Sequence, residues 1–229
     1  MMPKDDKENV LILGSSIAKN IYSGLSKATG NSIHLDLVVV TGCPPLIKKY
    51  EFDISNFSET KCEVLYTQIN KNLNEKNYSK IILSYQWGEL AKKAISEDFT
   101  FLDYTFDNII AQLPKEKLLI IGQPVRWITR LDIFALRELN FQNKINNLNS
   151  SNIQRGLFTT EEKFNNKMRN LELSSYSLIN YFCEGDKCLL YKKVNDIYFF
   201  TSADFIHISD YFSELIGEEI LNTLYNQTS

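Results

Sequence analysis

Three residues with the functional groups of a serine-hydrolase triad stand near the two ends of the chain. Ser16 follows a Gly-Ser turn after an apolar run, and it opens a helix-like stretch. Asp204 and His207 lie three positions apart in the segment SADFIHIS, just before the last helical stretch. A D-x-x-H pair can place a carboxylate beside an imidazole, where the carboxylate fixes the tautomer and stabilises the imidazolium. Ser16 would be the nucleophile, at a helix N-terminus that favours a developing oxyanion.

Each of these groups also has an ordinary structural explanation. Ser15 or Ser16 could only cap the following helix, with Gly14 allowing the turn, and a D-x-x-H spacing also arises by chance. The other histidine, His34, begins a strand with only Asp36 nearby, so we interpret it as a structural or surface residue. The combination favours the triad, because the order Ser, Asp, His is one of several that deliver the same geometry.

The elements that must position these residues alternate between strand and helix. Apolar runs predict strands over 9–14, 34–40, 80–85, 117–122 and 176–182. Helical spacing predicts helices over 15–29, 59–76 and 100–113 and an amphipathic helix at the end of the chain, with Val64, Ile69 and Leu73 facing the core in the second. Continuous apolar strands between helices are typical of a parallel sheet covered on both faces. The fold class is therefore α/β with a central sheet of about five strands.

The carboxyl ends of parallel strands meet at one edge of a sheet, and ligands bind beyond that edge. Four predicted loops come together there, at 14–16, 41–45, 84–88 and 122–126. The segment 126–175 is less regular and predicts two helices in an insertion or cap. We expect one domain over residues 1–229.

Composition excludes some classes of function. The chain has 229 residues, a net charge of −3 and a pI of about 5.5, with basic residues scattered along it. This balance argues against a nucleic-acid partner. No apolar run approaches the ~18 residues of a membrane span, and the polar N-terminus lacks an apolar segment, so we expect neither a membrane span nor a signal peptide in these residues.

Four cysteines leave the redox state open. Sequence proximity favours the disulfides Cys43–Cys62 and Cys183–Cys188, although three pairings are possible. Free buried thiols are an alternative, and a zinc site is a weaker one because no C-x-x-C pair exists and His is scarce. Disulfides would indicate an oxidising compartment, which conflicts with the missing export signal unless an upstream membrane part exists.

The blocks LILGSS and DFIHIS resemble the first and last blocks of the SGNH (GDSL-type) hydrolase superfamily. GCPPL at 42–46, Cys62 at the start of a helix, Trp87 after IILSYQ and the later cysteine pair are similar to the SGNH domains fused behind membrane acyltransferases of the acyltransferase-three family. The resemblance covers about residues 8–225, with 126–175 unmatched. It implies a three-layer, flavodoxin-like α/β/α fold, the triad Ser16, Asp204 and His207, and no cofactor or metal.

The chain departs from the family pattern at three places. Ser15 replaces the Asp of Gly-Asp-Ser, and Ile17 stands where the acyltransferase branch commonly has His. Trp87, beside Gln86, stands where the hydrolases have an oxyanion-binding Asn. The indole N–H or the Gln86 amide could donate to the oxyanion instead, or the backbone of Ser16 and the Gly42 loop could form the oxyanion hole.

The resemblance implies an O-acyltransferase, with acetyl as the expected group, acting on a bacterial surface glycan such as lipopolysaccharide O-antigen. The chain would be part of a longer membrane protein, on the periplasmic side of the inner membrane. A membrane acyltransferase domain would supply the acyl group, and the glycan would be the acceptor.

Three other functions remain open. A carbohydrate esterase or deacetylase would use the same triad. A non-catalytic glycan-binding domain would keep the fold, as the altered oxyanion block suggests. A nucleotide-binding module is weaker, since GSSIAKN lacks the glycine spacing that cradles phosphates.

Overall fold

The computed structural model describes residues 7–43, 45, 59–87, 113–142, 148–149 and 151–226. Except for its last residue, the helix predicted over 100–113 lies outside these ranges. Within the described residues, no helix has both the length and the apolar character needed to cross a membrane.

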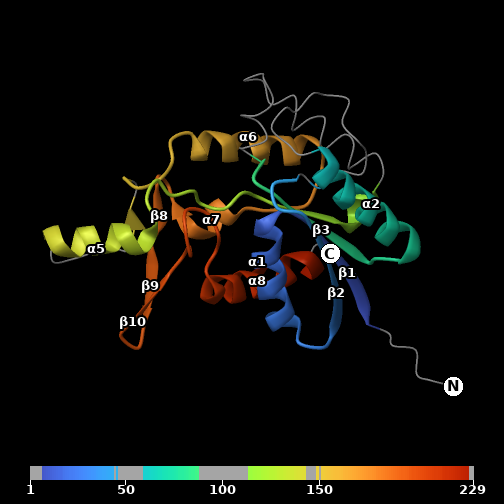
Figure 1. The fold of residues 1–229 in the computed structure, drawn as a ribbon, viewed down its shortest axis with the longest axis horizontal. Helices are drawn as coiled ribbons and strands as arrows, with labels where there is room; N and C mark the ends of the chain where they lie inside the picture. The colour runs from blue at the N-terminus through green and yellow to red at the C-terminus, as the bar shows by residue number, and fades with distance from the viewer. Residues whose placement is uncertain are drawn as a thin grey trace.

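A five-stranded parallel sheet forms the centre of the protein, as the sequence predicted (Figure 1). Its strand order is β2-β1-β3-β4-β6. The strands are β1 (Glu8–Gly14), β2 (Ile33–Val39), β3 (Lys80–Ser84), β4 (Leu118–Ile121) and β6 (Ser175–Tyr176). All four pairings are parallel. The last five residues of β1 are fully buried, because helices cover both faces of the sheet.

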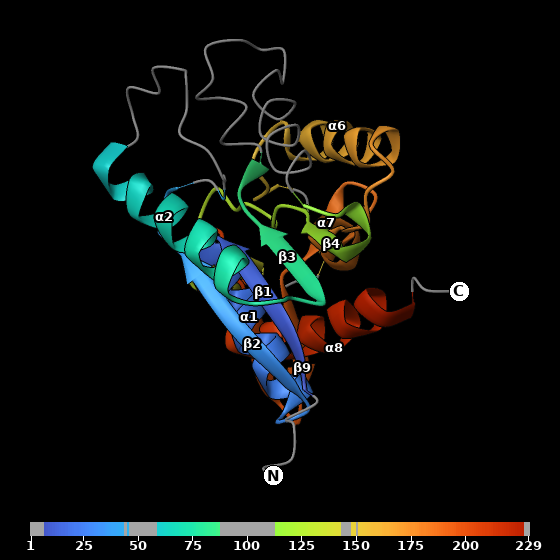
Figure 2. The ribbon, with the colours of Figure 1, turned by 90° about the vertical axis from the view of Figure 1, so that its right-hand side faces the viewer.

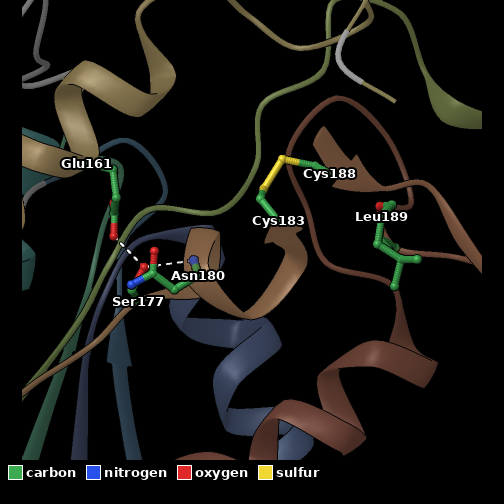
Figure 3. Close-up of a disulfide and its surroundings, with 7 residues drawn as sticks. Glu161, Ser177, Asn180, Cys183, Cys188 and Leu189 are labelled. Carbon is green, nitrogen blue, oxygen red and sulfur yellow. Dashed lines mark hydrogen bonds between the residues drawn. A yellow bond between two sulfur atoms is a disulfide. The ribbon is translucent and has the colours of Figure 1, made fainter. Parts of the chain in front are cut away.

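The predicted strand over 176–182 is wrong beyond its first residue. The sheet contributes only Ser175–Tyr176, and α7 (Leu178–Phe182) follows. Ser177 Oγ accepts a 3.0 Å hydrogen bond from the backbone N–H of Asn180, which caps the helix (Figure 3). Its hydroxyl also donates to Glu161 at 2.5 Å. A serine cap therefore turns an apolar run that reads as a strand into a short helix.

Two helical layers enclose the sheet. One layer contains α1 (Ser16–Thr29), α7 and α8 (Asp210–Asn226), which pack with Val10 and Ile12 of β1. The other contains α2 (Glu59–Glu75) and α6 (Leu157–Asn170), which pack with Leu11 and Leu13. Figure 1 shows α1 and α8 side by side, and Figure 2 shows α2 across the sheet from them. Alternate residues of one strand thus support opposite layers.

The predicted core face of α2 is correct at two positions and wrong at the third. Ile69 is fully buried and Leu73 packs against the same cluster, but Val64 is 64 % exposed. Positions 64 and 69 point about 140° apart on a helix. The core face is completed by Leu65 and Tyr66 instead.

The segment 126–175 contributes to the core as well as to the surface. It contains α5 (Leu131–Gln142), β5 (Leu148–Asn149) and α6. Phe164 and Met168 of α6 are buried with residues of β3 and β4. The predicted insertion therefore supplies one of the helices that cover the sheet.

The remaining elements are short. A single turn of 3-10 helix (Lys115–Lys117) precedes β4. β7 (Cys183–Glu184) and β8 (Lys187–Leu189) form an antiparallel sheet with β5, and β9 (Tyr191–Val194) pairs with β10 (Ile197–Phe200).

Both predicted disulfides are confirmed. Cys43 and Cys62 are joined with an S–S distance of 2.04 Å, which ties the loop after β2 to the first turns of α2. Cys183 and Cys188 link β7 to β8 (Figure 3). Since all four cysteines form disulfides, the alternatives of free thiols and of a zinc site no longer apply.

Candidate active site

The turn that carries Ser16 is fixed by a close approach of two strand ends. A Cβ atom at Gly14 would lie 1.9 Å from the carbonyl oxygen of Ser84, so glycine is required there. The backbone N–H of Ser15 donates to the same oxygen at 3.3 Å. The chain then enters α1 with Ser16 as its first residue.

The capping explanation for these serines receives little support. Ser15 occupies the N-cap position of α1, yet its side chain makes no capping hydrogen bond. Ser16 is half-buried, and its hydroxyl has no hydrogen-bond partner among the described residues. Ile17, at the position where the acyltransferase branch commonly has His, is fully buried in the core.

Asp204 and His207 form the predicted carboxylate–imidazole pair. Asp204 Oδ2 lies 2.6 Å from His207 Nδ1. Asp204 Oδ1 accepts hydrogen bonds of 2.8 Å from the backbone N–H groups of Ile206 and His207. An ionised carboxylate accepts from Nδ1–H, which leaves Nε2 as the proton acceptor of the neutral ring. The His207 side chain is 34 % exposed, so reactants can reach it.

The environment of Asp204 keeps its carboxyl group ionised. Partial burial alone would raise its pKa. The hydrogen bonds from the His207 ring and from the backbone N–H groups of His207 and Ile206 outweigh this effect, and the pKa lies below its ordinary value of 3.8. A permanent negative charge beside the imidazole is what an imidazolium intermediate requires.

Hydrogen bonds within the loop hold the backbone of His207 in place. The His207 carbonyl accepts hydrogen bonds of 2.8 Å from the Ala203 N–H and from the Ser202 hydroxyl. Ser202 and Ile208 form an antiparallel bridge around the same turn.

Helix α1 connects the Ser16 turn to this loop. Asn20, one turn after Ser16, donates from Nδ2 to the carbonyl oxygen of Ile208 at 3.0 Å. Further along, Gly24 lies against the backbone of Ser213 in α8. The two helices therefore hold the first and last blocks close together. Sequence reasoning missed Asn20, although its position four residues after Ser16 places both on one helix face.

Ser16 and His207 are not hydrogen-bonded to each other in the described structure. In free enzymes catalytic hydrogen bonds are often long or poorly aligned, and they tighten only when substrate binds. The carboxylate–imidazole pair is thus formed, while the Ser16 hydroxyl has no hydrogen-bond partner among the described residues.

The indole N–H of Trp87, one of the candidate oxyanion donors, is engaged within the core. Its indole N–H donates to the carbonyl oxygen of Ile121 at 2.7 Å, and the side chain is fully buried. Its ring stacks on Phe164 with centroids 6.2 Å apart. The aromatic residue is a core residue that joins β4 to α6.

Two further oxyanion candidates, Gly42 and Gln86, differ in their exposure. Gly42 stands in the exposed turn after β2 with a φ of 82°, which favours glycine. The Tyr85 hydroxyl donates to its carbonyl oxygen at 3.2 Å, and the Cys43–Cys62 disulfide fixes the next residue. Gln86 is half-buried and lines a cavity beside the His207 loop.

This cavity has a volume of about 80 Å³ and lies where the loop after β4 meets the start of α6. Three backbone hydrogen bonds build it: Trp127 N–H to Phe205 at 2.9 Å, Ile128 N–H to Asn152 at 2.8 Å, and Gln154 N–H to Arg126 at 2.9 Å. The lining comprises Gln86, Gln123, Pro124, Arg126, Gln154, Arg155, Gly156, Leu157, Thr160 and Ile206. Sequence reasoning missed most of these residues, because they come from separate loops without a motif.

His34 lies away from this region. It is in the second residue of β2, exposed, with Nε2 3.4 Å from Asp36, which confirms its interpretation as a surface residue. The part of the chain that the structure describes holds no group of three or more His, Cys, Asp or Glu side chains suited to a metal ion.

Two solved structures share this fold. The periplasmic domain of a lipopolysaccharide acetyltransferase from Salmonella ser. Paratyphi A aligns with a TM-score of 0.74 and 19 % identity, over 96 % of this chain and 85 % of that chain. A protein described as lipolytic and of the G-D-S-L family, from Desulfitobacterium hafniense DCB-2, aligns with a TM-score of 0.53 and 10 % identity, over 95 % and 99 % of the two chains. These likenesses confirm the expected SGNH hydrolase fold.

No curated protein matches the chain. The model of a protein family, described as the SGNH domain fused to AT3 domains, matches residues 2–222. With nearly the whole chain matched, the protein belongs to the family of SGNH domains that are fused to AT3 domains.

Proposed function

We propose that this protein is a serine-dependent O-acyltransferase, with acetyl as the transferred group, that modifies hydroxyl groups of a bacterial surface glycan. The observation that supports this most is the 2.6 Å Asp204–His207 pair in a loop that is tied to the Ser16 helix through Asn20 and Ile208. Membership of the SGNH family and the fold shared with a lipopolysaccharide acetyltransferase domain favour acyl transfer as the chemistry.

In the first half-reaction, His207 Nε2 takes the proton of the Ser16 hydroxyl while Ser16 Oγ attacks the acyl carbon of the donor. The resulting tetrahedral oxyanion collapses to a serine ester. The leaving group departs with the proton from the imidazolium. Asp204 stays ionised throughout and stabilises the imidazolium.

The oxyanion needs donors that are aimed at it before the reaction starts. Ser16 is the first residue of α1, so its backbone N–H has no acceptor within the helix. With the Trp87 indole committed to Ile121, this N–H and the Gly42 turn remain as the oxyanion hole, with the Gln86 amide as a further donor.

In the second half-reaction, the neutral His207 takes a proton from a sugar hydroxyl, whose oxygen attacks the Ser16 ester. Collapse of this second intermediate forms the glycan ester and returns the proton to Ser16. Water competes for the same ester, so acyl transfer requires that the acceptor occupy the site beside His207.

The two disulfides fit an oxidising compartment, and we place the domain on the periplasmic side of the bacterial inner membrane. Its partner would be a membrane acyltransferase domain of the AT3 type, which would supply the acyl group. Lipopolysaccharide O-antigen is the acceptor we propose first.

The test is an acetyl-transfer assay with a chromogenic acetyl ester as donor, in the presence and absence of O-antigen oligosaccharide. The proposal expects acetylated oligosaccharide from the wild-type protein and none from Ser16→Ala. Ser26→Ala is the matched control, because Ser26 is an exposed serine of the same helix. Equal product from wild type and Ser16→Ala would refute a serine acyl-enzyme.

A carbohydrate esterase with the same triad is the second candidate. The exposed face of His207 gives water a path to the acyl-enzyme, and the fold is shared with a protein described as lipolytic. Fast ester hydrolysis that does not respond to the acceptor would favour the esterase. If neither activity depends on Ser16 while the oligosaccharide binds, the domain is a glycan-binding module.

A further inference from the structure

The cavity beside the His207 loop has a charge that the proposed chemistry does not require. We propose that it binds an oxyanion carried by the acceptor, so that the preferred acceptor is an acidic glycan with a carboxylate or phosphate group. This inference rests on the proposed function, and it specifies the substrate class of the same site.

Two arginines line the cavity, and none of its described lining residues is acidic. Arg126 comes from the loop after β4, and Arg155 from the segment just before α6. Arg155 is exposed and forms no ion pair with any residue that the structure describes. The positive charge of Arg155 therefore has no acidic partner among the described residues, in a chain whose net charge is −3. Guanidinium groups bind carboxylate and phosphate in a bidentate manner, so this pair favours an anion.

The other polar groups of the cavity are suited to a sugar ring. Gln86, Gln123, Gln154 and Thr160 supply amide and hydroxyl groups that can both donate and accept hydrogen bonds. Gln123 is buried, so its amide is held in place by its surroundings. A site for a simple inorganic anion would need donors only, whereas this mixture matches a sugar that also carries an acid group.

The start of α6 adds to the positive potential of the cavity. Gly156 and Leu157 line the cavity, the N-cap residue Gly156 offers no side chain, and the first turn has no acidic residue. The N-terminal end of a helix carries a partial positive charge. This contribution supplements the arginines and would not indicate a site without them.

The cavity lies next to His207, so we infer that it binds the acceptor. Ile206 lines the cavity, precedes His207 and donates its backbone N–H to Asp204. A sugar whose acid group contacts the arginines would therefore place neighbouring sugar hydroxyls beside the residue that must remove a hydroxyl proton in the second half-reaction.

The experiment measures binding without chemistry, by titration calorimetry on the full chain carrying Ser16→Ala. The probes are an oligogalacturonate, the neutral oligosaccharide obtained by reducing its carboxyl groups, and a phosphorylated oligomannose. We expect an acidic probe to bind at least tenfold more tightly than the neutral one, and less tightly as salt rises. Preference for the uronate or for the phosphorylated probe identifies which acid group the acceptor carries.

Adding Arg155→Gln should weaken binding of the preferred acidic probe by about 10- to 100-fold, the range for a lost charge-assisted hydrogen bond. Arg155 is exposed, so this change should leave the fold intact, which a thermal melt verifies. Arg126→Gln should have the same direction of effect. Arg137→Gln, at an exposed arginine of α5, is the matched control and should change nothing.

Equal affinity for acidic and neutral probes, or binding that is unchanged in both cavity variants, would overturn the inference. Because binding is measured with Ser16 removed, this failure differs from failure of the acyltransferase proposal. An enzyme that acetylates neutral glycans but shows no acidic preference refutes only the acidic acceptor. A protein that prefers acidic glycans but acetylates none refutes only the chemistry.

Discussion

Asn20 and Ile208, 188 residues apart in the chain, are joined by a 3.0 Å hydrogen bond from the Asn20 side chain to the Ile208 carbonyl. Asn20 lies one helical turn after Ser16, and Ile208 directly follows His207. The bond therefore links the segment that carries the proposed nucleophile to the segment that carries the proposed base.

Asn20→Ala should reduce activity far more than stability. The hydrogen bond from Asn20 Nδ2 contributes about 0.5–1.5 kcal/mol to stability. Asn20 Oδ1 is buried with no partner in the described structure, and alanine also removes this unfavourable group. The decrease in the free energy of unfolding should therefore lie at the low end of that range. A shift of the His207 loop by about 1 Å can lower kcat up to about 100-fold. Asn70→Ala removes a similar 2.9 Å amide–carbonyl bond within α2 and should leave kcat unchanged. Equal kcat in both variants, measured with a chromogenic acetyl ester, would contradict this positioning role.

The crossing of α1 and α8 should not tolerate a side chain at Gly24. A Cβ atom there would lie 1.8 Å from the Ser213 carbonyl oxygen, and one at Gly217 would lie 2.4 Å from the Gly24 carbonyl carbon. Gly24→Ala should lower the free energy of unfolding by about 1–3 kcal/mol, as overpacking does. Ser26→Ala, at an exposed position of the same helix, should change it by less than about 0.5 kcal/mol. Urea unfolding compares the two variants, and an unchanged free energy of unfolding in Gly24→Ala would contradict a close contact between α1 and α8 at Gly24.

Asp204→Asn should remove a pH-dependent contribution to stability. The folded pKa of Asp204 lies below 3.8, so its stabilisation is fully present above that pH and is lost as pH falls through the folded pKa. The difference in unfolding free energy between wild type and Asp204→Asn should thus be constant near neutral pH and shrink in acid. Urea unfolding at a series of pH values measures it. A difference that grows in acid would mean that the Asp204 pKa is raised by burial.

The same substitution should also reduce acyl transfer, by up to about 10⁴-fold, the magnitude known for the corresponding change in the serine-protease template. Asn cannot accept the Nδ1–H bond as a carboxylate does, so the imidazolium loses its counter-charge.

The two disulfides should differ in what they stabilise. Cys43–Cys62 closes a separation of 19 residues, and Cys183–Cys188 one of 5. The chain-entropy relation gives about 3 and about 2 kcal/mol for these loops. Double serine variants should show this order by thermal unfolding, and only loss of the first should lower kcat, because it releases the turn of Gly42. An equal kcat for both variants would argue against Gly42 in the oxyanion hole.

The sheet could be predicted from sequence because continuous apolar runs such as 10–13 and 118–121 are typical of strands buried on both faces. The run at 176–182 is also mostly apolar, but it contains Ser177, which caps α7. A serine in an apolar run does not reveal whether it will cap a helix until its neighbours in space are known.

The candidate site could be predicted only where its residues are close in sequence. The pairing of Asp204 with His207 could be predicted from their three-residue spacing. Ser16 was predicted as the nucleophile because the block LILGSS precedes the block DFIHIS, as in the SGNH hydrolases. The role of Trp87 could not be predicted, because its N–H partner Ile121 lies 34 residues away on a neighbouring strand. Arg126 belongs to a loop, 122–126, that was expected at the ligand-binding edge, whereas Arg155 was missed because it comes from a distant segment without a motif.

The central claim is that Ser16 forms a covalent ester, and mass spectrometry of the protein after rapid quenching of its reaction with an acetyl ester tests it most directly. We predict one added acetyl group, located on the peptide that contains Ser16 and absent in Ser16→Ala, with Ser26→Ala labelled as the wild type is. An acetyl group on another residue, or turnover in Ser16→Ala at the wild-type rate, would contradict the account.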